Sequence, residues 1–408
     1  MDTRKLGTST GALVTNLSTG KVLYELNAAT GFAPASTTKI ATAVAALETL
    51  GPAAKFTTKV ILTDSAPTHR IVLVGGGDPT LAAGRYPAAD YPQPATLSSL
   101  ATATARALRG RHITAVRLSF NANRFGGPVA AQGWKPVGAP GNYFSSGNVA
   151  PITGLELDQG RLTASGAPED ADDPANYRPR STAPGSDAAR AFARLLAKDG
   201  IKVRGVPKTV AHTRRQSPAR GSELASVQSP PLAAIVQEML TESNNVIAET
   251  LARQVALATG RPGTFTGAAA AVAAVDARLG VNGIHVYDGS GLSPLDRISP
   301  RALVALITLT AKSGRLRSVI TGLPVAGFSG TLGPGSFFGP FGRPALGTVR
   351  AKTGNLTHVA TMAGLTYSSG GQLLAFAFMG NGIATKLGTQ PELELAKLAS
   401  TLAGCGCR

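Results

Sequence analysis

A serine and a lysine stand three positions apart at the beginning of an apolar stretch that reaches Leu50. Ile40 and Val44 recur at the spacing of one helix face, so we predict a buried helix that begins near Ser36. Residues three apart lie on the same face of a helix, which places the Ser36 hydroxyl beside the Lys39 amine. This pair could act as a nucleophile and its base. The same four-residue pattern also arises by chance, and a serine at this place can simply cap the helix.

Two further short motifs supply polar groups later in the chain. Ser243 and Asn245 lie between two predicted helices and offer a hydroxyl and a side-chain amide. Lys352, Thr353 and Gly354 lie at the end of a predicted strand and offer an ammonium group, a hydroxyl and a residue without a side chain. Ser-x-x-Lys, Ser-x-Asn and Lys-Thr-Gly in this order resemble the motif set of penicillin-binding proteins and class A β-lactamases. Each motif is weak alone, but the ordered set is a strong signal.

The resemblance extends to one family. Ser36 and Ser243 are 207 positions apart, a gap that leaves room for inserted material at 55–225. Several other stretches look like the D-alanyl-D-alanine carboxypeptidase/endopeptidase family: 76–79, 229–232, 288–293, 323–332 and 350–354. This is the class C group of low-molecular-mass penicillin-binding proteins, which carries domains between its first and second motifs.

The resemblance implies an α+β fold with several domains. We expect a penicillin-binding, β-lactamase-like transpeptidase domain, in which helices flank an antiparallel sheet built from both chain ends, and β-rich inserted domains. We assign 1–54 and 226–408 to the discontinuous catalytic domain, 55–84 and 155–225 to inserted domain II, and 85–154 to inserted domain III.

Local patterns predict the individual elements. Alternation and turn residues predict strands at 12–17, 21–26, 59–62, 71–74, 113–120, 201–206, 348–352, 358–367 and 372–379. Apolar residues at helical spacing predict helices at 97–108, 187–198, 232–240, 245–258, 267–279, 299–313 and 391–402.

In the role that the resemblance implies, Ser36 is the nucleophile that accepts the acyl group and Lys39 is its base. An alcohol needs a base at hydrogen-bond distance to react as a nucleophile. Lys39 can serve only while it is neutral, and both burial and the nearby charge of Lys352 would lower its pKa. The oxyanion hole would consist of the backbone N–H groups of Ser36 and Asn355.

The other motif residues would handle the substrate. Ser243 would relay a proton to the leaving nitrogen, and Asn245 would bind the substrate amide or hold the lysine base. Lys352 and Thr353 suit the terminal carboxylate of a peptide, because charged hydrogen bonds are the strong ones. Gly354 would let the substrate backbone lie against the strand.

The activity that the resemblance implies is that of a serine DD-peptidase. It would remove the terminal D-alanine from peptidoglycan stem peptides, could also cut peptide cross-links, and would be acylated by β-lactams. One departure concerns the third residue of the stem peptide, whose free amine is read in related enzymes by an acidic residue near an aromatic pair. The corresponding stretch at 133–143 contains Trp134 and Tyr143 but no Asp or Glu.

Composition narrows the classes of molecule that this chain can bind. The chain of 408 residues has 40 Lys and Arg against 23 Asp and Glu, a net charge of +17, which leaves an anionic wall polymer or a membrane surface open as partners. Nucleic acid is not expected, because aromatic residues make up only 5% and the basic residues are scattered. The histidines lack metal-site spacing, so we expect neither a metal nor a cofactor. Both cysteines stand in the last four residues and support no disulfide framework.

The expected substrate implies an extracytoplasmic location: the periplasm, the cell envelope or the medium. No apolar run approaches 18 residues and no export signal is recognisable near Met1, so we expect that the export signal is missing from this sequence. Two alternatives stay open. A β-lactamase or esterase could use the same three motifs, and a non-catalytic protein could bind wall polymer through its positive charge.

Overall fold

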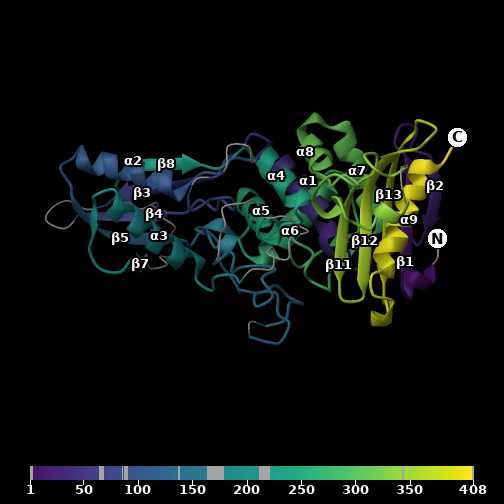
Figure 1. Cartoon of the computed structure of the whole chain (residues 1–408), viewed down its shortest axis with the longest axis horizontal. Coiled ribbons are helices and arrows are strands. Elements are labelled where there is room, and N and C mark those ends of the chain that lie inside the picture. Colours follow the sequence, from purple (N-terminus) through teal and green to yellow (C-terminus); the bar gives the residue numbers. More distant parts are fainter. Residues whose placement is uncertain are drawn as a thin grey trace.

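A five-stranded antiparallel sheet joins the two ends of the chain in the computed structural model (Figure 1). The structure describes residues 3–63, 69–84, 86, 91–136, 138–162, 179–210, 221–341 and 344–406. In sheet order the strands are β11 (Arg350–Leu356), β12 (Val359–Tyr367), β13 (Leu373–Asn381), β1 (Ser9–Asn16) and β2 (Val22–Leu26). β1 pairs with β13 along its whole length, from Ser9 opposite Asn381 to Asn16 opposite Leu374. This confirms the predicted sheet built from both chain ends.

Helices cover both faces of this sheet. Ala12 and Val14 of β1 pack in a cluster with residues of α9 (Gln390–Gly404), whereas Leu13 between them belongs to the cluster on the other face, with residues of α7 (Pro300–Lys312). Successive side chains of a strand point to opposite faces, so a strand covered on both sides is apolar throughout. β12 accordingly is buried from Val359 to Thr366.

The helical lobe surrounds α1 (Thr38–Leu50), whose residues from Thr38 to Leu47 are all buried. A 3-10 turn at Ala35–Thr37 leads into this helix. The other helices of the lobe are α4 (Leu232–Thr241), α5 (Asn245–Ala258), α6 (Phe265–Arg278), α7 and α8 (Arg317–Gly322). The four alanines of α1, at 41, 43, 45 and 46, leave room for α5 and α6 to pack closely, so the lobe can enclose the Lys39 side chain from the first turn of α1.

A mixed sheet belongs to the inserted region. Its order is β6 (Lys202–Val203), β5 (Ala115–Asn121), β4 (Arg70–Val74), β3 (Thr57–Leu62) and β8 (Ser222–Gln228), and β7 (Lys208–Thr209) also pairs with β5. α2 (Leu97–Arg109) and α3 (Pro184–Lys198) share a core with one face of this sheet. The mixed sheet lies at the opposite end of the long axis from the five-stranded sheet (Figure 1).

The inserted region differs in detail from the sequence expectation. The domain boundaries stay a prediction, but β5 pairs with β4, so residues 115–121 share a sheet with 57–62 and 70–74 although we assigned them to domain III. The strand predicted at 201–206 has only two residues, and β8 and α8 were not predicted. No residue of β8 is fully buried, and its apolar residues, Leu224, Ala225 and Val227, do not alternate strictly with polar ones, so the pattern that marks a strand is missing.

Short elements complete the described chain. β9 (Ile284–His285) pairs with β10 (Arg297–Ile298). Further 3-10 turns lie at Thr3–Lys5, Asp158–Gly160, Gly314–Leu316, Gly330–Leu332, Gly339–Phe341 and Thr385–Leu387. Among the residues that the structure describes, no helix combines the length and the apolar character needed to cross a bilayer.

Candidate active site

The Lys39 side chain is the centre of the site. Its Nζ atom lies 2.9 Å from Ser36 Oγ, 2.7 Å from Asn245 Oδ1 and 2.8 Å from the backbone oxygen of Ser290. A neutral amine has two hydrogens and one lone pair. The two oxygens from Asn245 and Ser290 can accept only hydrogen bonds from it, so they take both hydrogens. The lone pair is then left for the Ser36 hydroxyl, which is the arrangement that a base needs.

The environment of Lys39 favours the neutral form. Its side chain is fully buried, and burial lowers its pKa to about 7, although the charges of Asp288 and Glu249 act in the opposite direction. Burial has the same effect on Lys352, whose pKa is held well below the usual range, with the positive charge of Lys39 as the second cause. The pKa of Lys39 is therefore lowered by burial and not, as the sequence led us to expect, also by the charge of Lys352, whereas the charge of Lys39 does help to lower the pKa of Lys352.

The third motif lies directly against the nucleophile. A Cβ atom on Gly354 would stand 2.8 Å from Ser36 N and 2.7 Å from Pro34 O, so only glycine allows β11 to approach the turn at Ala35–Thr37 this closely. The hydroxyl of Thr361 on β12 donates to Pro34 O at 2.7 Å and fastens the turn to the sheet. Ser36 itself stays partly exposed, as a nucleophile that meets substrate must be.

The side chains of Lys352 and Thr353 face different neighbours. Lys352 Nζ donates to the backbone oxygen of Thr353 at 2.9 Å, and the Thr353 hydroxyl bonds to that of Thr331 at 3.2 Å. Thr353 is half-buried, and Asn355 two positions later is exposed. The strand thus presents one hydroxyl and one buried amine on the side of the site that Gly354 brings against Ser36.

Ser243 lies in the turn between α4 and α5 with a backbone φ of 55°. Its side chain forms no hydrogen bond with any residue that the structure describes. The next residue, Asn244, caps α5 by accepting from Ile247 N at 3.0 Å, which fixes where the helix starts and so where Asn245 points. The structure therefore joins Ser36, Lys39 and Asn245 by hydrogen bonds, brings the Lys-Thr-Gly strand against them by packing, and leaves the Ser243 and Asn355 side chains unbonded among the described residues.

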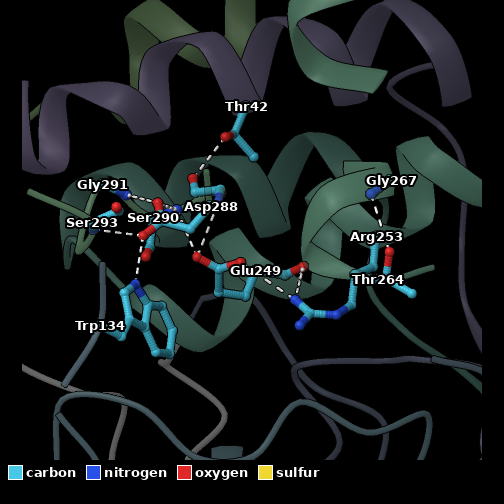
Figure 2. Close-up of polar contacts among 11 residues, drawn as sticks. Thr42, Trp134, Glu249, Arg253, Thr264, Gly267, Asp288, Ser290, Gly291 and Ser293 are labelled. Carbon is cyan, nitrogen blue, oxygen red and sulfur yellow. Dashed lines mark hydrogen bonds and ion pairs between the residues drawn. The ribbon is translucent and has the colours of Figure 1, made fainter. Parts of the chain in front are cut away.

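A loop at 288–293 supplies the Ser290 oxygen, and sequence reasoning gave this loop no role. Asp288 accepts hydrogen bonds from the backbone N–H groups of Ser290, Gly291 and Ser293 at 3.1, 2.6 and 2.6 Å, so one carboxylate folds the loop around itself (Figure 2). Thr42 of α1 donates to the backbone oxygen of Gly289 at 2.7 Å and ties the loop to the helix that carries Lys39. The family-like sequence at 288–293 was the only available signal.

Glu249 supports the same loop from α5. It accepts from the N–H groups of Gly289 and Ser290 at 3.0 and 2.9 Å, and its second oxygen lies 3.3 Å from Arg253 Nη1 (Figure 2). Both side chains of this ion pair are buried, and the guanidinium stacks 3.9 Å from the ring centroid of Phe265. Burial raises the pKa of Glu249, with the charge of Asp288 as the next cause. With no exposed surface, Glu249 cannot reach substrate and acts on the site through Ser290.

The inserted region contributes to the site through an arm at 122–162. Trp134 is buried and donates its indole N–H to Asp288 at 2.7 Å, and the Tyr143 hydroxyl donates to Leu292 O at 2.9 Å. The Nδ2 atom of Asn245 donates to Asn148 O at 3.0 Å, so the arm also orients the amide that holds Lys39. The burial of Trp134 shows that its ring packs in the interior and is not a wall of an open cleft. Within the described residues, no group of His, Cys, Asp and Glu is placed to hold a metal ion.

Comparison with known proteins decides the family. The model of the D-Ala-D-Ala carboxypeptidase 3 (S13) family matches residues 1–179 and 150–402. The chain belongs to this family. A carboxypeptidase of Mycobacterium tuberculosis is 35% identical over 402 residues, which cover 97% of this chain and 80% of the relative. The carboxypeptidase DacB of Mycolicibacterium smegmatis is also 35% identical, over 407 residues that cover 98% of this chain and 82% of the relative.

The solved structures agree on the fold of this S13 member. Penicillin-binding protein 4 of Haemophilus influenzae matches with a TM-score of 0.77 and 22% identity over 98% of both chains. A predatory endopeptidase of Bdellovibrio bacteriovorus matches with a TM-score of 0.59 and 18% identity, over 97% of this chain and 94% of that one. The predicted fold class, the family resemblance and the hydrolase class, a serine-type D-Ala-D-Ala carboxypeptidase, are thereby confirmed. A β-lactamase or esterase and a purely binding role are not favoured.

Proposed function

We propose that this S13 carboxypeptidase works through an acyl-enzyme on Ser36, with Lys39 as the base. The observation that carries the proposal is the environment of Lys39 Nζ, whose two carbonyl contacts leave one position free for Ser36 Oγ at 2.9 Å. Lys39 takes the hydroxyl proton while Ser36 Oγ bonds to the carbonyl carbon of the penultimate D-alanine. The backbone N–H groups of Ser36 and Asn355 stabilise the resulting oxyanion.

The second half of the reaction releases two products. The C–N bond to the terminal D-alanine breaks, and Ser243 passes a proton that originates on Lys39 to the leaving nitrogen. Water then attacks the ester at Ser36, with Lys39 again as the base, and releases the shortened peptide. Lys352 and Thr353 hold the terminal carboxylate of the substrate, and Gly354 leaves space for its backbone. β-Lactams acylate the same hydroxyl.

The substrate that this chemistry fits is the D-Ala-D-Ala end of a peptidoglycan stem peptide, so the enzyme acts outside the cytoplasm. The absence of Asp and Glu from 133–143 leads us to propose that this stretch does not read a free amine on the third residue of the stem peptide. Support for an additional cut at cross-links is limited to the fold that this chain shares with an endopeptidase.

The test is product analysis on purified muropeptides. We expect one D-alanine to be released per monomeric pentapeptide, and none by Ser36→Ala. Cross-linked dimers, incubated in parallel, report the endopeptidase activity as conversion to monomers. Equal D-alanine release by the wild type and Ser36→Ala would overturn the proposal.

A further inference from the structure

A strongly basic hollow lies on the open face of the inserted sheet. In β5, Val116, Leu118 and Phe120 belong to the core shared with α2 and α3, whereas Arg117 between them is exposed. Alternation along the strand therefore turns Arg117 to the face that neither helix covers. This face belongs to the end of the molecule that lies away from the five-stranded sheet (Figure 1).

Four cations line this hollow, which has a volume of about 450 Å³. The remaining lining residues are Leu118, Ser119, Gly205 and Val206, and none of the lining residues that the structure describes is acidic. We call this site the basic hollow and define it by its cations: Arg70, Arg117, Arg204 and Lys208.

The strand register concentrates these charges. Arg70 of β4 stands directly opposite Arg117 of β5, and Lys208 of β7 stands opposite Ser119, one alternation further along. Arg204 is held beside them because its N–H donates to Val116 O at 2.8 Å. Like charges on facing positions of neighbouring strands destabilise a sheet, so the fold itself gains nothing from this arrangement. Among the described residues, Arg117, Arg204 and Lys208 form no ion pair.

We propose that the basic hollow binds a linear polyanion that carries phosphate groups, a phosphodiester polymer of the cell wall. Three of the four cations are arginines, whose planar guanidinium offers paired donors that match phosphate oxygens. Arg117, Arg204 and Lys208, with no acidic residue in the described part of the lining, can neutralise several phosphates of one chain, and release of their counterions favours binding.

Two other polyanionic partners fit the hollow less well. Binding to a lipid surface usually combines cations with a broad apolar face, and within the described lining Val206 is the only large apolar side chain that is exposed. Single-stranded nucleic acid is normally held by stacking on aromatic rings, and the lining residues that the structure describes include no aromatic one.

Binding at this end would leave the site around Ser36 free. The polymer would hold the enzyme close to its cross-linked substrate and raise the effective substrate concentration without any change in the catalytic residues. The inference goes beyond the proposed function, because it concerns where the enzyme is held and not how it reacts.

The test compares two triple variants of equal net charge. The first removes three cations of the hollow: Arg117→Gln, Arg204→Gln and Lys208→Gln. The matched control removes three exposed cations from the helices on the covered side of the same sheet: Arg106→Gln, Arg194→Gln and Lys198→Gln. Both variants change only exposed side chains, and the single variant Arg204→Gln, outside any strand, repeats the test without altering the sheet.

The probe is fluorescent inorganic polyphosphate, and its Kd is measured by anisotropy at several salt concentrations. We expect the hollow triple variant to bind polyphosphate about tenfold or more weakly at about 0.1 M salt. The magnitude of its slope of log K against log salt should fall by about 2. Arg204→Gln should change the affinity and the slope in the same directions. The control triple variant should stay within about twofold of the wild type. D-Alanine release from a soluble pentapeptide should be the same in the wild type and in all three variants. A failure of this proposal can therefore be told apart from a failure of the catalytic proposal.

Three results would overturn the proposal. Equal weakening in both triple variants would mean that only the overall charge matters. Unchanged polyphosphate binding in the hollow triple variant would place the binding surface elsewhere. Loss of binding to phosphatidylglycerol vesicles with polyphosphate binding retained would identify the partner as a membrane.

Discussion

Removal of the Glu249 charge should lower the pH at which Ser36 becomes reactive. Glu249→Gln keeps an oxygen that can accept from Gly289 N and Ser290 N, and it deletes one of the two charges that raise the pKa of Lys39. Lys39 Nζ bonds to the backbone oxygen of Ser290, and the backbone N–H of the same residue bonds to Glu249. This chain of contacts places the Lys39 and Glu249 charges roughly 8 Å apart.

At an effective dielectric constant of about 20, unit charges at that distance attract by about 2 kcal/mol. A pKa change of one unit corresponds to about 1.4 kcal/mol, and Glu249 is only partly ionised near neutral pH, so we expect a change of about one pH unit. Lys39 must be neutral to act, so the rate rises with pH through its pKa, near 7 in the wild type. In Glu249→Gln this midpoint should move to lower pH.

The assay is the second-order rate constant for acylation by a fluorescent penicillin, measured between about pH 5 and 9. Glu25→Gln is the control, because Glu25 is a partly exposed carboxylate paired with Arg301 far from the site, and its loss should leave the midpoint in place. Glu249→Gln also leaves Arg253 buried without its ion-pair partner, so the protein should be measured well below its melting temperature. A midpoint that stays at the wild-type value, or moves to higher pH, would refute the reasoning.

Two further predictions concern the supports of the site. Gly354→Ala places a methyl group 2.8 Å from Ser36 N and should slow acylation by penicillin by about a hundredfold through displaced oxyanion donors. Gly314→Ala, whose new methyl group would have no neighbour within 4 Å, should leave the rate unchanged, and equal rates in both variants would contradict the close packing. Trp134→Phe removes the indole donor to buried Asp288 and should lower the free energy of unfolding in urea by about 1.5 to 3 kcal/mol; an unchanged midpoint would show that the arm does not hold the loop.

The residues that share one turn or one motif were predictable. The i, i+3 spacing alone predicted that Lys39 lies beside Ser36, and the option that Asn245 holds Lys39 is the contact that the structure contains. The strands of the five-stranded sheet followed from alternation, within two or three residues at most ends. The catalytic and substrate-binding roles assigned to all the motif residues remain predictions, and the described residues form no side-chain hydrogen bond with Ser243 or Asn355.

The supports of Lys39 were not predictable, because they depend on contacts between distant segments. Asp288 folds a loop that no periodicity marks, and Glu249 reaches it from 40 positions earlier in the chain. Trp134 comes from the inserted region and is placed by the fold of that whole region against α6. A pattern in the sequence shows which side chains can carry a charge, but the direction in which a loop turns its N–H groups depends on three-dimensional packing.

The most direct test of the central claim, that Ser36 is the nucleophile and Lys39 its base, is the intact mass of the protein after incubation with penicillin. We predict one stoichiometric adduct on the wild type, mapped by peptide digestion to Ser36. Ser36→Ala should gain none, and Lys39→Met should acquire the adduct only very slowly. An adduct on Ser36→Ala at the wild-type rate, or no adduct on the wild type, would contradict the account.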